Sequence, residues 1–283
     1  MKTEGGPRNG RALAPDLASV LPLGMSESEK ALLKLVVKAV LEQDLIQDGD
    51  RILIAVSGGK DSTCLAYALS AIRKAVKRDY ELKAVHISSD FCACCKKNAL
   101  STRLESWGIP FDDIFVPVIG RLKPGRKMNC YWCSTQRRTE LLRYSCEGGF
   151  NKIALGHHLD DIIETYFMNA MNKGRLSTMP VKMAYVKYPL TLIRPLAYVE
   201  ERQVIAFASE ANIMKAACTC PYGINSARRD IRGRIAALTE GSSAVKRRLL
   251  EAFARGGEPL PGTSGYETPN ADESLGENAE APD

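Results

Sequence analysis

Features typical of exported and membrane proteins are missing from this sequence of 283 residues. It contains no run of about 18 apolar residues, the length that a helix needs to cross a bilayer. The N-terminal segment, MKTEGGPRNGRALAPD, is polar and has no apolar core of the kind found in secretory signals. We therefore expect a cytoplasmic protein with no membrane anchor.

Basic residues are missing from the C-terminal end of the chain. Residues 257–283 contain seven Asp or Glu and no Lys or Arg, so the preceding residues carry a net charge of +13, against +6 for the whole chain. A body this basic fits a polyanionic partner such as nucleic acid. A charge that serves only solubility is the alternative.

Cysteine is absent from residues 1–50, although the chain contains nine cysteines in all. In a cytoplasmic protein these cysteines do not predict a disulfide framework. Their clustering favours metal binding or sulfur chemistry instead.

The two ends of the chain differ in composition from its centre. Residues 1–25 are rich in Gly, Pro and small polar types, and residues 256–283 are acidic, so both segments are expected to be disordered tails. Residues 26–255 are expected to form one domain. Its last part, residues 228–255, carries eight Lys or Arg against three acids and is predicted to be mainly helical.

Short apolar runs alternate with segments of helical periodicity through most of this domain. Ser26 and Glu29 form a capping-box pattern that predicts a helix from Glu27. Further helices are expected over residues 60–72, 99–107, 131–145, 160–172 and 199–210, and strands over residues 52–56, 82–87, 113–118, 152–155 and 192–196. This alternation predicts an α/β fold, a parallel sheet with helices on both faces.

The first predicted strand leads into a glycine turn and a helix, in the sequence RILIAVSGGKDST (residues 51–63). Glycines let the backbone approach a ligand closely, and the N–H groups of the first helical turn favour an anion there. The sequence is not the GxxxxGK[ST] of a P-loop NTPase, and a purely structural corner is the alternative. The predicted phosphate-binding residues are Ser57, Gly58, Gly59, Lys60, Asp61 and Ser62.

A second polar cluster, GHHLDD (residues 156–161), follows the fourth predicted strand. The carboxyl ends of parallel strands meet at one edge of a sheet, so Asp160 or Asp161 is expected to share a Mg²⁺ with Asp61. Gly156, His157 and His158 are expected near the phosphates. The alternative is a capped helix with a satisfied histidine.

The clustered cysteines form a CxxC pair, Cys130 and Cys133, directly before a predicted helix, and a later pair, Cys218 and Cys220. A lone CxxC fits zinc, a redox pair or chance. With the later cysteines added, three or four thiolates suit structural zinc or an iron–sulfur cluster.

Four segments in this order, SGGKDS, CYWCSTQRR, ALGHHLDDIIET and IRPLAYVEERQV, resemble the tRNA 2-thiocytidine synthetase (TtcA-type) branch of the PP-loop ATP pyrophosphatase family, over roughly residues 27–240. The resemblance implies a domain that adenylates a tRNA pyrimidine with ATP and Mg²⁺, after which sulfur bound to a [4Fe–4S] cluster displaces AMP. It implies Cys130, Cys133 and Cys220 as cluster ligands, with Cys218 as the alternative to Cys220, and places Arg137 near the nucleotide. Lys60, Asp61, Asp160 and Asp161 would be catalytic with the three cysteines.

Two features depart from this family pattern. The later cysteine motif reads CPYG where the thiocytidine branch has a CGSQ-like sequence, whereas the lack of cysteine in residues 1–50 argues against the thiouridine branch. Cys92, Cys94 and Cys95 have no place in the pattern; they suit a second metal, a sulfur relay or a buried set.

Three other readings compete with 2-thiocytidine synthesis: a tRNA 2-thiouridine synthetase, an amidating enzyme such as a lysidine synthetase, and a zinc-binding, nucleotide-sensing RNA-binding protein. For the leading reading we expect tRNA and a sulfur donor, such as a cysteine desulfurase, as partners, and a homodimer as the assembly to test.

Overall fold

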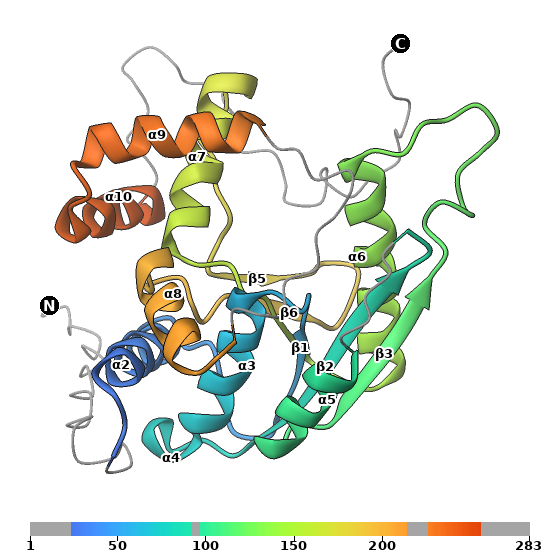
Figure 1. The fold of residues 1–283 in the computed structure, drawn as a ribbon, viewed down its shortest axis with the longest axis horizontal. Helices are drawn as coiled ribbons and strands as arrows, with labels where there is room; N and C mark the ends of the chain where they lie inside the picture. Colours follow the sequence, from blue (N-terminus) through green and yellow to red (C-terminus); the bar gives the residue numbers. More distant parts are fainter. Residues whose placement is uncertain (1–23, 92–96, 214–225, 256–283) are drawn as a thin grey trace, which may run out of the picture.

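A six-stranded sheet forms the centre of the computed structural model, which describes residues 24–91, 97–213 and 226–255 (Figure 1). The strand order is β3-β2-β1-β4-β6-β5, and every neighbouring pair is parallel except β5 and β6. The strands are β1 (Asp50–Ala55), β2 (Tyr80–Ser89), β3 (Phe111–Val116), β4 (Lys152–Ala154), β5 (Lys182–Ala184) and β6 (Thr191–Ile193). The predicted parallel sheet is confirmed, with one antiparallel strand added at its edge.

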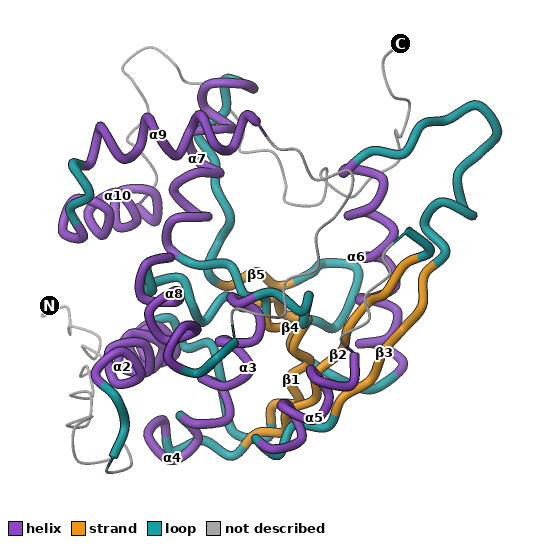
Figure 2. Tube along the Cα trace, in the orientation of Figure 1, coloured by secondary structure: helices purple, strands orange, loops and turns teal. Residues whose placement is uncertain are grey.

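Helices cover both faces of this sheet, as Figure 2 shows by the purple segments around the orange strands. Those in the described residues are α2 (Glu27–Glu42), α3 (Lys60–Ala71), α4 (Arg73–Val76), α5 (Lys97–Ser106), α6 (Cys130–Glu147), α7 (Leu159–Lys173), α8 (Glu201–Glu210), α9 (Ser226–Thr239) and α10 (Ser243–Arg255). Each helix that the sequence predicts is present, with its ends shifted by a few residues at most.

The alternation of side chains along β1 separates two buried layers. Ile52 and Ile54 pack in a cluster with α2, α3, α5 and α8, whereas Leu53 packs on the other face, with Leu141 and Leu142 of α6. Burying one such side chain is worth about 1.5–3 kcal/mol, several times the spread of intrinsic helix propensities among ordinary residues. Packing against the sheet therefore decides where these helices lie.

The predicted capping box at the start of α2 forms only in part. Ser26 Oγ accepts a hydrogen bond from the backbone N–H of Glu29 at 3.2 Å, as expected. The Glu29 carboxylate does not return to the backbone, because it accepts a hydrogen bond from the Tyr67 hydroxyl of α3. This tertiary contact replaces the local one and joins α2 to α3.

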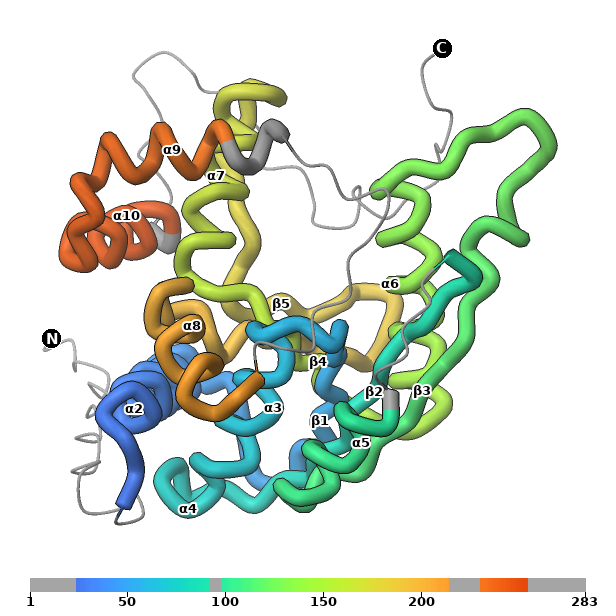
Figure 3. The backbone as a smooth tube through the Cα atoms, viewed as in Figure 1, coloured from blue at the N-terminus to red at the C-terminus, as the bar shows by residue number. Residues whose placement is uncertain are grey.

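Helices α7, α9 and α10 form a third apolar cluster beyond the edge of the sheet. These helices lie at the upper left of Figure 3. Its buried members include Ile162 and Ile163 of α7, Ile231 and Ile235 of α9, and Leu250 of α10. The predicted basic helical segment is thus confirmed as two helices, which are separated at Gly241, where φ is +68°.

Some predicted features lie outside the described residues. These are Cys92, Cys94, Cys95, Cys218 and Cys220, nearly all of the N-terminal tail and the whole C-terminal tail. Among the residues that the structure describes, every helix is too short or too polar to span a membrane.

Candidate functional site

The order of the strands places two loops side by side at one edge of the sheet. From β1 the chain continues to β2 and β3 on one side, and it later returns to β4 on the other side of β1. Ligands of open α/β sheets bind at the carboxyl ends of the strands where the order reverses in this way. The loop after β1 carries SGGKDS and the loop after β4 carries GHHLDD, as the sequence predicts.

The glycine turn after β1 is held by its two serines. The backbone N–H of Ser57 donates to Ser62 Oγ at 3.0 Å, and the two hydroxyl oxygens lie 3.1 Å apart. Gly58 has a φ of +77°, which a residue with a side chain rarely adopts. Gly59 is the N-cap of α3 and offers no side-chain acceptor, so the N–H groups of the first turn are suited to an anion.

The loop after β4 contacts this turn directly through Gly156. A Cβ on Gly156 would stand 2.9 Å from the N and the Cα of Ser62 and 3.0 Å from the carbonyl carbon of Asp61. Only glycine allows so close an approach without displacing backbone, so Gly156 fixes the spacing between the two loops.

His158 and Asp161 together cap the N-terminus of α7, and His158 also lies near Asp61. The N–H of Asp161 donates to His158 Nδ1 at 3.3 Å, and the N–H of His158 donates to Asp161 Oδ2 at 3.1 Å. Since Nδ1 accepts, the neutral ring carries its proton on Nε2, which lies 3.4 Å from Asp161 and 3.9 Å from Asp61 Oδ1. The capped helix that the sequence offers as the alternative is therefore present, and His158, 1% exposed, is a buried bridge between two acids rather than the predicted phosphate ligand.

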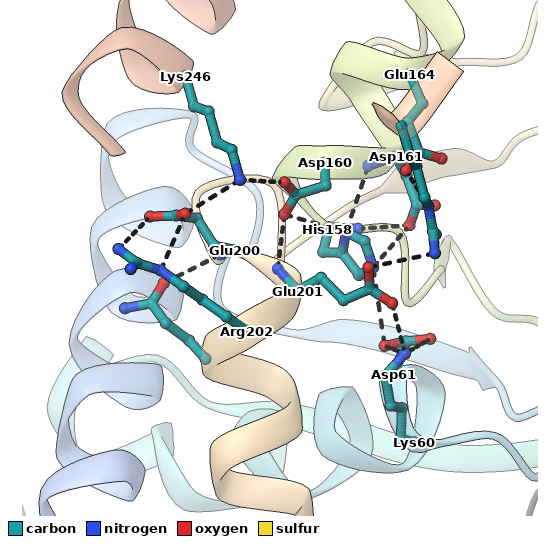
Figure 4. A network of polar contacts seen from close by, with 12 residues as sticks. Lys60, Asp61, His158, Asp160, Asp161, Glu164, Glu200, Glu201, Arg202 and Lys246 are labelled. Carbon is teal, nitrogen blue, oxygen red and sulfur yellow. Dashed lines mark hydrogen bonds and ion pairs between the residues drawn. The ribbon is translucent and has the colours of Figure 1, made fainter. Parts of the chain in front are cut away.

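Asp160, the neighbour of Asp161, points elsewhere (Figure 4). Its Oδ1 lies 2.6 Å from Lys246 Nζ of α10, and its Oδ2 accepts from the N–H of Glu201 at 2.7 Å. Burial acts to raise the pKa of Asp160, but these two hydrogen bonds lower it below the ordinary value of 3.8. Of the two acids predicted to accompany Asp61, the geometry favours Asp161.

Lys60 is held between two acids. Its Nζ lies 3.0 Å from Asp61 Oδ1 and 3.1 Å from Oε1 of Glu201, the first residue of α8. Burial acts to lower the pKa of Lys60. The negative charges of Asp61 and Glu201, together with the hydrogen bonds that Lys60 donates to them, nevertheless raise this pKa above 10.5.

A cavity of about 460 Å³ opens between the two loops and α6. Of the predicted ligands, Ser57, Asp61, Ser62, Arg137, Gly156, His157 and Asp161 line it, whereas Gly58, Gly59, Lys60 and Asp160 do not. No set of three metal-binding side chains occurs within residues 24–91, 97–213 and 226–255. Mg²⁺ usually takes one or two carboxylates and completes its shell with water and phosphate oxygens, so Asp61 and Asp161 would suffice for it.

Basic groups line the cavity together with these acids. Arg137 and Arg138 come from α6 and His157 from the loop after β4. Behind His157 lies Arg194, whose Nε–H donates to His157 Nδ1 at 3.3 Å. Burial lowers the pKa of Arg194 to about 10. The cavity thus has an acidic side and a basic side, which suits a polyphosphate accompanied by a cation.

The CxxC pair lies on the α6 face that lines the cavity. Helix α6 begins at Cys130, and its N-cap, Asn129, accepts from the N–H of Trp132 at 2.8 Å. Cys130 and Cys133 precede Ser134 and Arg137 by four residues each, so each pair shares one stripe of the helix. Cys130 is exposed and Cys133 is half-buried, and neither of these two cysteines lines the cavity itself.

Cys64 and Cys146, which the sequence predicts as core residues, lie away from this stripe. Cys64 is fully buried in α3, and burial raises the pKa of its thiol to about 12. Cys146 lies in the last turn of α6 and packs against the second apolar cluster. Cys220 lies outside the described residues, so its place as a third ligand stays a prediction.

Sequence reasoning missed several residues that line or support the site. Ser134 and Arg138 carry a detectable signal, because they continue the helical stripe that begins at Cys130. Tyr185 comes from the loop between β5 and β6 and has no such signal. Glu201 lies inside the quoted segment IRPLAYVEERQV without having been assigned a role.

Comparison with known proteins agrees with this geometry. Residues 26–236 match the family of the PP-loop domain. The tRNA-cytidine(32) 2-sulfurtransferase of Anaeromyxobacter sp. (strain Fw109-5) is 34% identical over 233 residues, which cover 81% of this chain and 77% of that protein. The enzyme of the same name from Geobacter sulfurreducens is 36% identical over 222 residues, covering 76% and 86%.

Among solved structures, the U34-tRNA thiolase NcsA from Methanococcus maripaludis with its [4Fe-4S] cluster superposes with a TM-score of 0.66. It is 23% identical in sequence, and the match covers 80% of this chain and 79% of NcsA. This likeness shows a shared fold. With the family match over residues 26–236 and relatives above 30% identity, the chain belongs to the PP-loop ATP pyrophosphatase family and, within it, to the group of the tRNA-cytidine(32) 2-sulfurtransferases.

Proposed function

We propose that this protein is an ATP-dependent tRNA sulfurtransferase that replaces the C2 oxygen of a cytidine, at position 32 as in its relatives, with sulfur. The observation that carries the proposal is the position of Cys130 and Cys133 on the α6 stripe that continues into Ser134 and Arg137 of the cavity wall. Groups suited to sulfur delivery therefore lie one helical turn from groups that line the cavity suited to adenylation.

ATP fits the side of the cavity formed by the glycine turn. The start of α3 favours its phosphates, and Asp61 and Asp161 would hold the Mg²⁺ that accompanies them. Arg137 and His157 face the same space and would hold phosphate oxygens. The close approach of Gly156 to Ser62 supports this placement, because it builds one continuous wall from two loops.

Adenylation solves a chemical problem of the base. The C2 oxygen of a pyrimidine is amide-like and leaves poorly, but it leaves readily once AMP has been transferred to it. In that transfer the C2 oxygen forms a bond to the α-phosphorus while the bond between the α- and β-phosphates breaks, and the negative charge on the departing pyrophosphate must be stabilised. The first-turn N–H groups of α3 and the Lys60 ammonium group are suited to that role.

The thiols suit an iron–sulfur cluster with three cysteine ligands. Cys130, which is exposed, and Cys133, which is half-buried, lie in the first turn of α6, and Cys220 is the predicted third ligand. The cluster, when bound, would supply the sulfur atom that replaces the C2 oxygen. Helix α6 would hold the cluster through Cys130 and Cys133, which precede Ser134 and Arg137 by one turn.

The tRNA would be held by basic groups that flank the cavity. Lys123, Arg126 and Lys127 are exposed in the loop before α6, and Arg247 and Arg248 are exposed on α10. Such groups bind phosphates whatever the sequence of the tRNA. To enter the cavity, the target base must be unpaired or extruded. A sulfur donor such as a cysteine desulfurase would reload the site, and the cytoplasm, where tRNA is modified, is the expected location.

The substitution Cys130→Ser separates the roles of the two sides of the cavity. We expect the variant to bind ATP like the wild type and to form no thiolated tRNA, since ATP contacts the glycine turn and only the thiols hold the cluster. Wild-type protein purified without oxygen should absorb visible light as iron–sulfur proteins do. A colourless wild type with one bound zinc would support the zinc-binding, RNA-binding reading instead.

A further inference from the structure

Glu201 contacts two cations that belong to different parts of the protein. Its Oε1 lies 3.1 Å from Lys60 Nζ at the start of α3, and its Oε2 lies 3.5 Å from an Nη atom of Arg232 on α9. The Glu201 side chain is 25% exposed and that of Lys60 is 21% exposed, so both charges are largely shielded from water. One carboxylate thus connects Lys60 of the phosphate loop to Arg232 of α9. Figure 4 shows its contact with Lys60.

The backbone of Glu201 is held as firmly as its side chain. Its N–H donates to Asp160 at 2.7 Å, and the other oxygen of Asp160 lies 2.6 Å from Lys246 of α10. Lys246 also lies 3.3 Å from Glu200. Helices α9 and α10 therefore both contribute to fixing the start of α8, the first through Arg232 and the second through Lys246.

This arrangement conflicts with the expected role of Lys60. The lysine is suited to hold phosphate, yet it does not line the cavity, and its ammonium group is ion-paired with Asp61 and Glu201. Phosphates must compete with these carboxylates for it. Glu201 can release Lys60 at lower cost than an isolated acid could, because Arg232 remains beside its other oxygen.

We propose that Glu201 is a positioning residue whose ion pair holds Lys60 outside the cavity until phosphates take the place of the Glu201 carboxylate. Arg232 sets the strength of that ion pair. The inference rests on the proposed function in one respect, since it takes ATP as the ligand. It assigns to Arg232 of α9 an influence on nucleotide binding although Arg232 does not line the cavity.

The proposal predicts opposite signs for two substitutions that remove one charge each. Glu201→Gln removes one of the two carboxylates that pair with Lys60, so the protein should bind α,β-methylene-ATP with Mg²⁺ about fivefold more tightly than the wild type does. Arg232→Gln leaves Glu201 paired with Lys60 alone, so binding should weaken by about threefold. In the Glu201→Gln background, Arg232→Gln should change the dissociation constant by less than about 1.5-fold, because the coupling between the two residues is gone.

Two control variants separate this role from general electrostatics. Glu200→Gln removes the same charge one residue away, but Glu200 pairs with Lys246 and Arg202 rather than with Lys60. Arg234→Gln removes the same charge from α9, where Arg234 pairs with Asp230 on the surface at 3.1 Å. Each control should shift the dissociation constant by less than half as much, on a logarithmic scale, as its matched variant.

Arg232 also pairs with Glu164, which is 2% exposed, so Arg232→Gln is tested for folding by thermal unfolding before titration. If it does not fold, Arg232→Lys takes its place, and the sign of the Glu201→Gln effect still decides the matter. Isothermal titration of the full-length protein gives each constant. Unchanged or weaker binding by Glu201→Gln, or an equal gain from Glu200→Gln, would overturn the proposal.

The titration needs no tRNA and no sulfur, so its outcome is distinct from that of the proposed function. Tighter binding by Glu201→Gln in an enzyme that thiolates no tRNA would support the role of Glu201 and refute the sulfurtransferase. A wild-type protein that fails to bind the analogue would refute both.

Discussion

Gly156 and Ser62 lie so close that a single Cβ atom does not fit between them: built on Gly156, it would stand 2.9 Å from the Cα of Ser62. The contact joins the loop after β4 to the first turn of α3 across the point where the strand order reverses. The cavity wall therefore depends on a residue whose contribution is the absence of a side chain.

Gly156→Ala should damage both stability and nucleotide binding. The three atoms that a Cβ would meet all belong to the backbone and cannot rotate away, so the loops must separate, at a cost of about 1–3 kcal/mol. Urea unfolding gives the loss of stability, and titration with an ATP analogue gives the loss of affinity. The matched control is Gly233→Ala on α9, where a Cβ meets nothing within 4 Å; we expect it to stabilise the protein slightly or leave it unchanged. Equal effects of the two variants would contradict the role given to Gly156.

The layers of the fold were predictable from the sequence because each depends on a periodic pattern. Ile52, Leu53 and Ile54 alternate between two packed faces, and the segments between strands repeat apolar residues at helical spacing. Strand β5 was missed because it lacks such a pattern: its three residues, Lys182–Ala184, are mostly exposed and none of them is buried. Its place comes from antiparallel pairing with β6, a tertiary contact.

Cys130→Ser and Cys133→Ser should each abolish the visible absorbance of the anaerobically purified protein, together with tRNA thiolation. Loss of one of three thiolate ligands leaves the cluster unsupported. Cys146→Ser is the control on the same helix, since Cys146 lies in its last turn and packs against the apolar cluster. Iron and acid-labile sulfide analysis gives the cluster content. Full iron content in the Cys130→Ser protein would exclude this residue as a ligand.

Asp161→Asn should reduce ATP cleavage far more than Asp160→Asn does. Asp161 lines the cavity beside Asp61, and its amide replacement keeps an oxygen to cap α7 but removes the charge that would hold Mg²⁺. We expect a loss of about 100-fold or more in pyrophosphate release measured with tRNA present. Asp160→Asn should retain activity within about tenfold, since Asp160 faces Lys246. The reverse order would transfer the metal-binding role to Asp160.

The ion pair between Asp160 and Lys246 should make stability depend on pH at both extremes. Burial acts to raise the pKa of Asp160, but hydrogen bonds from Lys246 and Glu201 lower it below 3.8 in the folded protein. Its contribution is therefore complete above pH 3.8 and is lost as the pH falls through the lower, folded value. Burial acts to lower the pKa of Lys246, but Asp160 and Glu200 raise it above 10.5, so that contribution is lost as the pH rises through the folded value.

Lys246→Gln tests this pH dependence. Between these limits it should lower the free energy of unfolding by about 1.5–3 kcal/mol, because the Asp160 carboxylate, 15% exposed, loses a charged hydrogen-bond donor. Denaturant unfolding at several pH values measures the difference from the wild type. The difference should be constant from pH 6 to pH 8 and shrink on acidification below 3.8. A difference that grows on acidification would contradict the assignment.

The site was predictable only as far as motifs reach along the chain. A short stretch of sequence is enough to recognise the glycine turn, the acids after β4 and the CxxC pair. The structure then brings Ser57, Asp61, Arg137 and Asp161 to one cavity. The choice between Asp160 and Asp161 was not predictable, because neighbouring residues on a helix point in directions about 100° apart and the partners of Asp160 come from α8 and α10. The same holds for the bridge from Lys60 to Arg232, which joins residues far apart in sequence through Glu201.

The most direct test of the central claim is mass spectrometry of the nucleosides of tRNA from a strain that lacks the gene. The account predicts that 2-thiocytidine disappears, that the wild-type gene restores it, and that the Cys130→Ser gene does not. Undiminished 2-thiocytidine in the deletion strain, or loss of 2-thiouridine in its place, would contradict it.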